Sequence, residues 1–466
     1  MLLKSIQIKN YRSIEDLSLE TTVLDDNTYS YGLIGVNEAG KSSILKALAL
    51  KEGLITLSSK DFRDKSLNIE ISFVCMLTPE ESKLLIDFIV ADLPSYDFTN
   101  VDFSEVTYSY QYSVAEPKAK IQLKSRLIKD KKASILTLPK LPTNISLHTS
   151  IFWTAEEKYL ISAPINLSSF SSDPENISVP LRNCFLLAGI SEEDIEARIA
   201  NLAGDSTEIE QLQDELGKSV TEHINTVWPN HPIKITFLIS NGLINFHIKD
   251  IGTSGKSKTA DQRSDGFKQF VSFLLTISAQ NLNEELSNSI LLLDEPETHL
   301  HPQAQEHLLE ELKKITKNNR NNIVLFATHS NYMIDKSDLS RNYRIDKVKD
   351  KTIKTQLSKQ NSTYASVNYE VFGIVSTDYH NELYAKLHER YQDDDPTDDA
   401  RSRIKNFDAN FFVIVKGLKK NKKFKETPNE ATLPTYIRNC IHHPDNGDKY
   451  TEAELKMSTE SLISYL

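Results

Sequence analysis

A glycine-rich stretch near the N-terminus has the residue types and spacing of a phosphate-binding loop. It reads Gly-Val-Asn-Glu-Ala-Gly-Lys-Ser from Gly35 to Ser42, after a short apolar run and before a segment of helical spacing. Glycines let backbone N–H groups turn toward phosphate oxygens, and a helix start adds the positive end of its dipole. In this pattern Lys41 reaches the β- and γ-phosphates of ATP, and Ser42 binds Mg²⁺. The candidate nucleotide-binding residues in this stretch are Gly35, Asn37, Glu38, Gly40, Lys41, Ser42 and Ser43.

Two adjacent carboxylates, Asp294 and Glu295, follow a second apolar run far downstream. When a buried strand ends in such a pair, the two carboxylates can take different roles in phosphoryl transfer. Asp294 is placed to hold the Mg²⁺ shell, and Glu295 to orient or deprotonate the attacking water. His329 follows the next apolar run, at the strand end where α/β sheets bind ligands. We therefore predict Ser42 and Asp294 as metal ligands and Lys41, Glu295 and His329 as catalytic residues.

The order of these motifs resembles that of ABC/SMC-like ATPases of the OLD (overcoming lysogenization defect) and RecF branch, over residues 1–75 and 235–335. The resemblance implies that His329 is the switch histidine near the γ-phosphate and that Arg12, in Asn-Tyr-Arg-Ser, approaches the phosphates. It also implies that Ser264 and Gly266 belong to a signature loop that binds the γ-phosphate held by an opposite copy. The usual Leu-Ser-Gly-Gly form is absent, and Ser-Asp-Gly is also a common turn or helix cap.

Strands that alternate with helices predict an α/β fold, a mixed sheet covered by helices as in an ABC/SMC-like ATPase head. We expect an N-terminal lobe with the phosphate loop at 1–80 and a family-specific insertion with a helical arm at 81–232. A C-terminal lobe with the signature, the carboxylate pair and the switch histidine should span 233–345. A mainly α-helical interaction region should follow at 346–466.

Composition limits the classes of function. The net charge of −11 argues against a chain that coats nucleic acid throughout. Three widely spaced cysteines indicate neither a zinc site nor a disulfide framework, and no apolar stretch approaches a membrane span. We expect a cytoplasmic protein with no membrane partner.

The C-terminal region leaves alternatives open. Phe412–Gly417 has Lys416 where a TOPRIM nuclease needs a metal-binding Glu, so we predict no metal nuclease in this chain. Arg438 and His443 have the spacing of HEPN ribonucleases, in which such a pair cleaves RNA. Since Pro444 ends the helix at once, a capped, interface-forming element is the other interpretation. The lysine run at 416–425 is either a phosphate-attracting patch or a solvated loop.

The size and layout resemble those of stand-alone anti-phage defence ATPases. Septu-type ATPases work with a separate HNH nuclease and are our preferred comparison, and PARIS-type ATPases hold a separate TOPRIM effector. The resemblance implies ATP and Mg²⁺ as cofactors, a homodimer or higher homo-oligomer, a separate effector nuclease, and DNA or a phage protein as trigger. The alternatives are a RecF/SMC-like DNA-binding repair ATPase and the HEPN ribonuclease.

Overall fold

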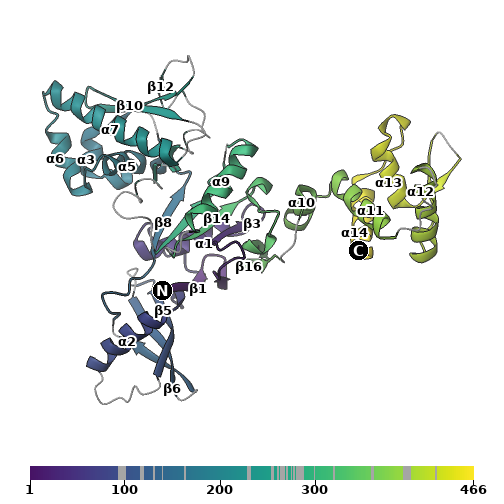
Figure 1. The fold of residues 1–466 in the computed structure, drawn as a ribbon, viewed down its shortest axis with the longest axis horizontal. Coiled ribbons are helices and arrows are strands. Elements are labelled where there is room, and N and C mark those ends of the chain that lie inside the picture. The colour runs from purple at the N-terminus through teal and green to yellow at the C-terminus, as the bar shows by residue number, and fades with distance from the viewer. Residues whose placement is uncertain are drawn as a thin grey trace. The chain divides into compact units, whose positions relative to one another are not determined.

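The chain forms two compact units, which are described separately. The first contains Met1–Asp335 and Leu339–Lys359, and the second contains Lys336–Asp338 and Gln360–Leu466. No helix in the described part of the chain is both long and apolar enough to cross a membrane. The computed structural model (Figure 1) describes residues 1–92, 101–115, 120–129, 132–138, 140–161, 164–227, 232–252, 257–259, 262, 268, 271–273, 275–276, 279, 288–298, 300–317, 321–357, 362–391, 400–425 and 428–466.

A mixed six-stranded sheet is the centre of the first unit. Its order is β16-β15-β3-β14-β13-β8, in which only β16 runs antiparallel to its neighbour. Every residue of β3, β13 and β14 is buried, as expected for central strands that are apolar over most of their length. The strands are β3 (Ser30–Ile34), β8 (Thr149–Thr154), β13 (Ser289–Asp294), β14 (Ile323–Thr328), β15 (Asn342–Val348) and β16 (Lys351–Gln356).

Helices pack against this sheet. Helix α1 (Lys41–Ala49) contacts β8, β13 and β14, and its Ile44, Leu45 and Leu48 are fully buried. Helix α9 (Pro302–Ile315) begins at a proline, whose missing N–H is not needed in the first turn. A mixed sheet with packed helices confirms the predicted α/β class.

A second sheet is antiparallel, with the order β2-β1-β4-β5-β6-β7. Apolar residues alternate with polar ones along β1, and Leu3, Ile6 and Ile8 are fully buried. Helix α2 packs on β5. The elements are β1 (Leu2–Tyr11), β2 (Ile14–Glu20), β4 (Ile69–Met76), α2 (Pro79–Asp92), β5 (Val101–Tyr112), β6 (Lys120–Lys129) and β7 (Lys132–Leu138).

A third group of elements in the first unit combines a β-hairpin with helices. Asn241 and Gly242, with φ of 53° and 75°, form the turn between β10 and β11. Helix α7 buries an apolar stripe, and it packs on β10 and α5. The elements are β9 (Ile165–Asn166), α3 (Leu167–Ser172), α4 (Pro174–Ile177), α5 (Val179–Leu187), α6 (Ile195–Ala200), α7 (Ser206–Val227), β10 (Ile233–Ser240), β11 (Leu243–Asp250) and β12 (Lys258–Thr259).

The second unit is mainly α-helical, as predicted. An aromatic cluster that includes Tyr384, Phe407, Phe411 and Phe412 forms one of its cores. The segment Asp408–Val415 is a π-helix, so the string compared with a TOPRIM strand is not a strand. The other elements are α10 (Tyr364–Phe372), α11 (Thr377–Tyr391), α12 (Ala400–Phe407), β17 (Lys422–Lys423), β18 (Glu430–Ala431), α13 (Leu433–His442) and α14 (Glu452–Tyr465).

The predicted segments and the observed units divide the chain differently. Strand β8 lies within the predicted insertion at 81–232, yet it pairs in parallel with β13 in the central sheet. The β15–β16 hairpin extends past the predicted boundary at 345 and belongs to the first unit. Strand pairing across long stretches of chain depends on partners that local periodicity does not reveal.

The backbone of Ile345 lies too close to Gly35 of the phosphate loop for a side chain to fit there. Gly35 has a φ of 148°, and an added Cβ would lie 2.3 Å from the backbone oxygen of Ile345. At Gly53, with φ of 73°, an added Cβ would meet nothing within 4 Å. We expect Gly35→Ala to lower the free energy of unfolding by roughly 3 kcal/mol or more, and Gly53→Ala by about 1 kcal/mol. Urea denaturation measures both values, and equal losses would contradict the close approach.

Candidate functional site

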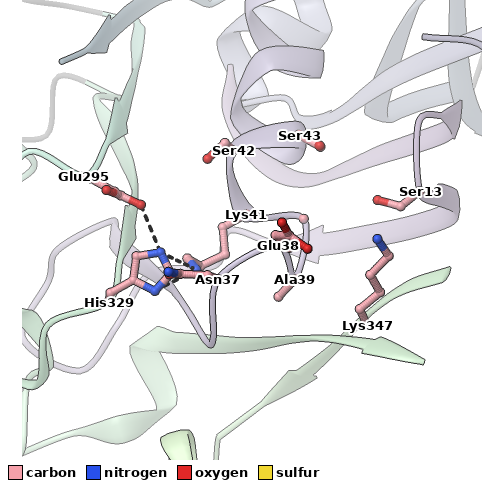
Figure 2. Close-up of a pocket in the computed structure, with 11 residues that line it drawn as sticks. Ser13, Asn37, Glu38, Ala39, Lys41, Ser42, Ser43, Glu295, His329 and Lys347 are labelled. Carbon is pink, nitrogen blue, oxygen red and sulfur yellow. Dashed lines mark hydrogen bonds and ion pairs between the residues drawn. The ribbon is translucent and has the colours of Figure 1, made fainter. Parts of the chain in front are cut away.

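A pocket of about 560 Å³ lies over the phosphate loop at the carboxyl ends of the central strands. It gathers residues from the loop, from the turn after β1, from the ends of β13 and β14, and from β15 (Figure 2). Most of the predicted site residues therefore lie together. The lining residues are Ser13, Asn37, Glu38, Ala39, Gly40, Lys41, Ser42, Ser43, Glu295, His329 and Lys347.

Lys41 carries the buried cation of the pocket. Lys41 is only 4% exposed, and its Nζ donates to the backbone oxygens of Gly35 at 2.9 Å and Val36 at 3.0 Å. Burial lowers the pKa of Lys41 to about 8, against the opposing charges of Glu295 and Asp294. The ammonium is therefore held in the loop, where phosphate oxygens would favour its charged form.

Ser42 and Asp294 are the predicted metal ligands, and the structure brings them into contact. The Ser42 hydroxyl donates to Asp294 Oδ1 at 2.8 Å. Burial raises the pKa of Asp294, and the bond from Ser42 partly offsets this rise. A hydroxyl and a buried carboxylate fit Mg²⁺, which takes few protein ligands and fills its other positions with water and phosphate oxygens.

Glu295 and His329 meet at one end of the pocket. Glu295 Oε1 lies 2.9 Å from His329 Nε2, and both ring nitrogens lie within 3.2 Å of Lys41 Nζ (Figure 2). Burial, followed by the charge of Lys41, lowers the pKa of His329. Glu295 has a φ of 53°, and its N–H donates to the oxygen of Ala327 at 3.0 Å. This strained backbone directs the second carboxylate away from the strand and toward the histidine.

Glu297 supports the histidine loop from behind. It is 4% exposed, and its Oε1 accepts a hydrogen bond from the Thr328 hydroxyl. Thr328 Oγ1 in turn accepts from the N–H of Ser330 at 2.9 Å. Burial raises the pKa of Glu297 to about 7. Glu297 was not predicted as a site residue, because its burial depends on packing between strand ends that are distant in the sequence.

Arg12 and Gly35 are predicted site residues that do not line the pocket. Arg12 does not line the pocket, since its Nε pairs with Asp61 Oδ1 at 2.8 Å and its guanidinium lies over the Tyr11 ring. Its neighbour Ser13 does line the pocket. Gly35 does not line the pocket either, but its backbone oxygen accepts a hydrogen bond from Lys41 Nζ. The predicted signature residues Ser264 and Gly266 lie outside the described residues.

The C-terminal candidates form no comparable site among the described residues. Arg438 Nη1 donates to the neighbouring Asn439 side chain at 3.0 Å, and His443 is the residue after the last turn of α13. Three lysines of the run pair with carboxylates of their own unit, namely Lys420 with Asp408, Lys422 with Glu454 and Lys423 with Glu430. These pairs favour a structural role for much of the lysine run.

The loop, the carboxylate pair and the histidine define a P-loop nucleotide-binding protein. Residues 1–334 match the family model described as the AAA ATPase domain. The match covers more than half of the chain, so the chain belongs to the AAA ATPase domain family, which implies ATP binding and ATPase activity.

Individual relatives are distant. An uncharacterised protein of Methanocaldococcus jannaschii is 29% identical over 114 residues, which are 23% of this chain and 29% of that protein. Among solved structures, an Smc head bound to the C-winged helix domain of ScpA is 12% identical, with a TM-score of 0.42 over 77% of this chain and 98% of the other. An Smc head bound to the C-terminal domain of ScpA, derived from Pyrococcus furiosus, is also 12% identical, with a TM-score of 0.39 over 77% and 96% of the two chains.

The buried carboxyl of Glu297 makes a pH-dependent contribution to stability. Its folded-state pKa of about 7 lies above the ordinary value of 4.5, so the stability is full below pH 4.5 and is lost as the pH rises through 7. We expect wild type to lose about 2.5 kcal/mol relative to Glu297→Gln between pH 5 and pH 8. Denaturant titrations at the two pH values measure this difference. Parallel pH profiles would contradict the burial of an ionisable group.

Proposed function

We propose that this chain is the ATP-hydrolysing regulatory subunit of a bacterial anti-phage defence complex and controls a separate effector nuclease. The observation that supports ATP hydrolysis best is the contact of Lys41, Glu295 and His329 at one end of the pocket, beside the Ser42–Asp294 pair. This arrangement unites a cation for phosphate, a base for water and oxygen ligands for a metal ion.

Each residue takes a defined role in hydrolysis. Lys41 neutralises charge that develops on the β- and γ-phosphate oxygens. Glu295 accepts a proton from the attacking water, and His329 holds that carboxylate through its 2.9 Å contact. Ser42 and Asp294 would hold Mg²⁺, which would screen the phosphate charge when bound. The network of Glu297 and Thr328 keeps the histidine loop in place.

We further propose that a second copy completes the site. Side-chain exposures of 40% for Glu295 and 31% for His329 leave the catalytic end open to water in one chain. Hydrolysis is controlled best where a covering surface excludes bulk water. By the family resemblance, Ser264 and Gly266 of the opposite copy would supply that surface, so two copies would associate head to tail around ATP.

The second unit is the proposed contact region for the effector nuclease. It has its own aromatic core, and several of its lysines are already paired with carboxylates, which supports protein contact over nucleic-acid contact. Its resemblance to Septu-type and PARIS-type tails supports an HNH or a TOPRIM partner, with DNA or a phage protein as trigger.

Substitutions at the two ends of the catalytic cluster should separate binding from hydrolysis. Lys41→Ala should weaken ATP binding, whereas Glu295→Gln should keep ATP binding and lower the turnover rate about 100-fold or more. Steady-state phosphate release and equilibrium binding measure the two effects. Glu310→Gln, on the exposed side of α9, is the matched control and should leave both unchanged. Equal turnover by Glu295→Gln and wild type would show that another residue activates the water.

Co-expression with the product of the adjacent gene tests the regulatory role. We expect a stable complex whose nuclease activity changes with the nucleotide supplied. Full nuclease activity of the purified chain alone would overturn the proposal, and its loss in His443→Ala with unchanged ATP turnover would identify the HEPN ribonuclease instead.

A further inference from the structure

The β15–β16 hairpin is bound directly to the phosphate loop. The Thr352 hydroxyl donates to the oxygen of Ala39 at 3.1 Å and lies 2.7 Å from the Ser13 hydroxyl. The Thr352 N–H also donates to the backbone oxygen of Ser13 at 2.9 Å. One residue of the hairpin thus joins the loop to the turn after β1.

The hairpin packs directly against a glycine of the phosphate loop. Gly40 has a φ of 109°, and a Cβ there would lie 2.3 Å from Thr352 Oγ1. The space that a side chain at Gly40 would need is therefore filled by the hairpin. The hairpin is a fixed wall of the pocket rather than a neighbouring surface.

Lys347 projects from this wall. In the hairpin register Lys347 is directly opposite Thr352, so the two side chains share one face of the ladder. Lys347 is exposed, it lines the pocket beside Ser13, and no carboxylate pairs with it in the part of the chain that the structure describes (Figure 2). A second lysine therefore faces the pocket, on a strand that is held in register with the phosphate loop.

The position of Lys347 determines which part of a nucleotide it would meet. Glu295 and His329 lie at one end of the pocket, Ser13 and Lys347 lie at the other, and Lys41 lies between them (Figure 2). In this arrangement the γ-phosphate lies beside Glu295, and Lys41 binds the β- and γ-phosphates. The negatively charged group left on the side of Lys347 is then the α-phosphate. We propose that Lys347 binds the α-phosphate of the nucleotide. This assignment rests on the proposed function, in which ATP occupies the pocket.

Equilibrium binding of ADP, GDP and a non-hydrolysable ATP analogue tests the assignment. All three contain the α-phosphate, so Lys347→Asn should weaken them by the same factor, about 5- to 20-fold at low salt. The factor should shrink at high salt, because the contact is partly exposed to solvent. Lys347→Arg keeps the charge and should retain most of the affinity. Thermal unfolding with unchanged midpoints checks that each variant folds.

Lys349→Asn is the matched control. It removes the same charge two residues further along, at an exposed position with φ of 58° that asparagine tolerates and that does not line the pocket. We expect its affinities to equal those of wild type.

If Lys349→Asn weakens binding as much as Lys347→Asn, the effect comes from the overall electrostatic field of the protein and not from a direct contact. Unchanged binding in Lys347→Asn would exclude the contact. A loss confined to adenine nucleotides would place Lys347 on the base. Each of these results overturns the assignment while wild type still binds nucleotide, whereas a wild type that binds none would overturn the proposed function itself.

Discussion

The phosphate loop encloses the charged end of Lys41, which is only 4% exposed. A charge taken out of water is costly unless polar groups surround it. Here two backbone oxygens of the loop accept its hydrogens, and Glu295 and Asp294 supply opposite charge. These partners come from parts of the chain that are far apart in sequence. The site therefore exists only when the central sheet is assembled.

The strand order explains how these partners meet. Strands β3, β14 and β13 are parallel neighbours, so their carboxyl ends lie at one edge of the sheet. The phosphate loop follows β3, His329 follows β14, and Asp294 and Glu295 end or follow β13. Glu297 and Thr328 connect the last two strand ends behind the pocket. The hairpin β15–β16 closes the remaining side through Thr352.

Much of this arrangement could be predicted from sequence because its signals are local. The glycine spacing before Lys41, the apolar run before Asp294 and the turn at Asn241–Gly242 each specify their own backbone. The place of β8 beside β13 could not be predicted, since parallel pairing depends on partners distant in the chain. Lys347 was missed for the same reason, because only its register opposite Thr352 brings it to the pocket. Arg12 shows the opposite case: its sequence context resembles a phosphate-binding motif, but its side chain pairs with Asp61.

We propose that two copies close around ATP to form the active enzyme. The most direct measurement is the mass of the Glu295→Gln variant in solution by light scattering, with Mg²⁺ and either ATP or ADP. With ATP we expect a mass at least twice that of one chain, and with ADP a smaller mass. A Glu295→Gln variant that remains a single chain with bound ATP, together with a wild type that turns over ATP as a monomer, would contradict it.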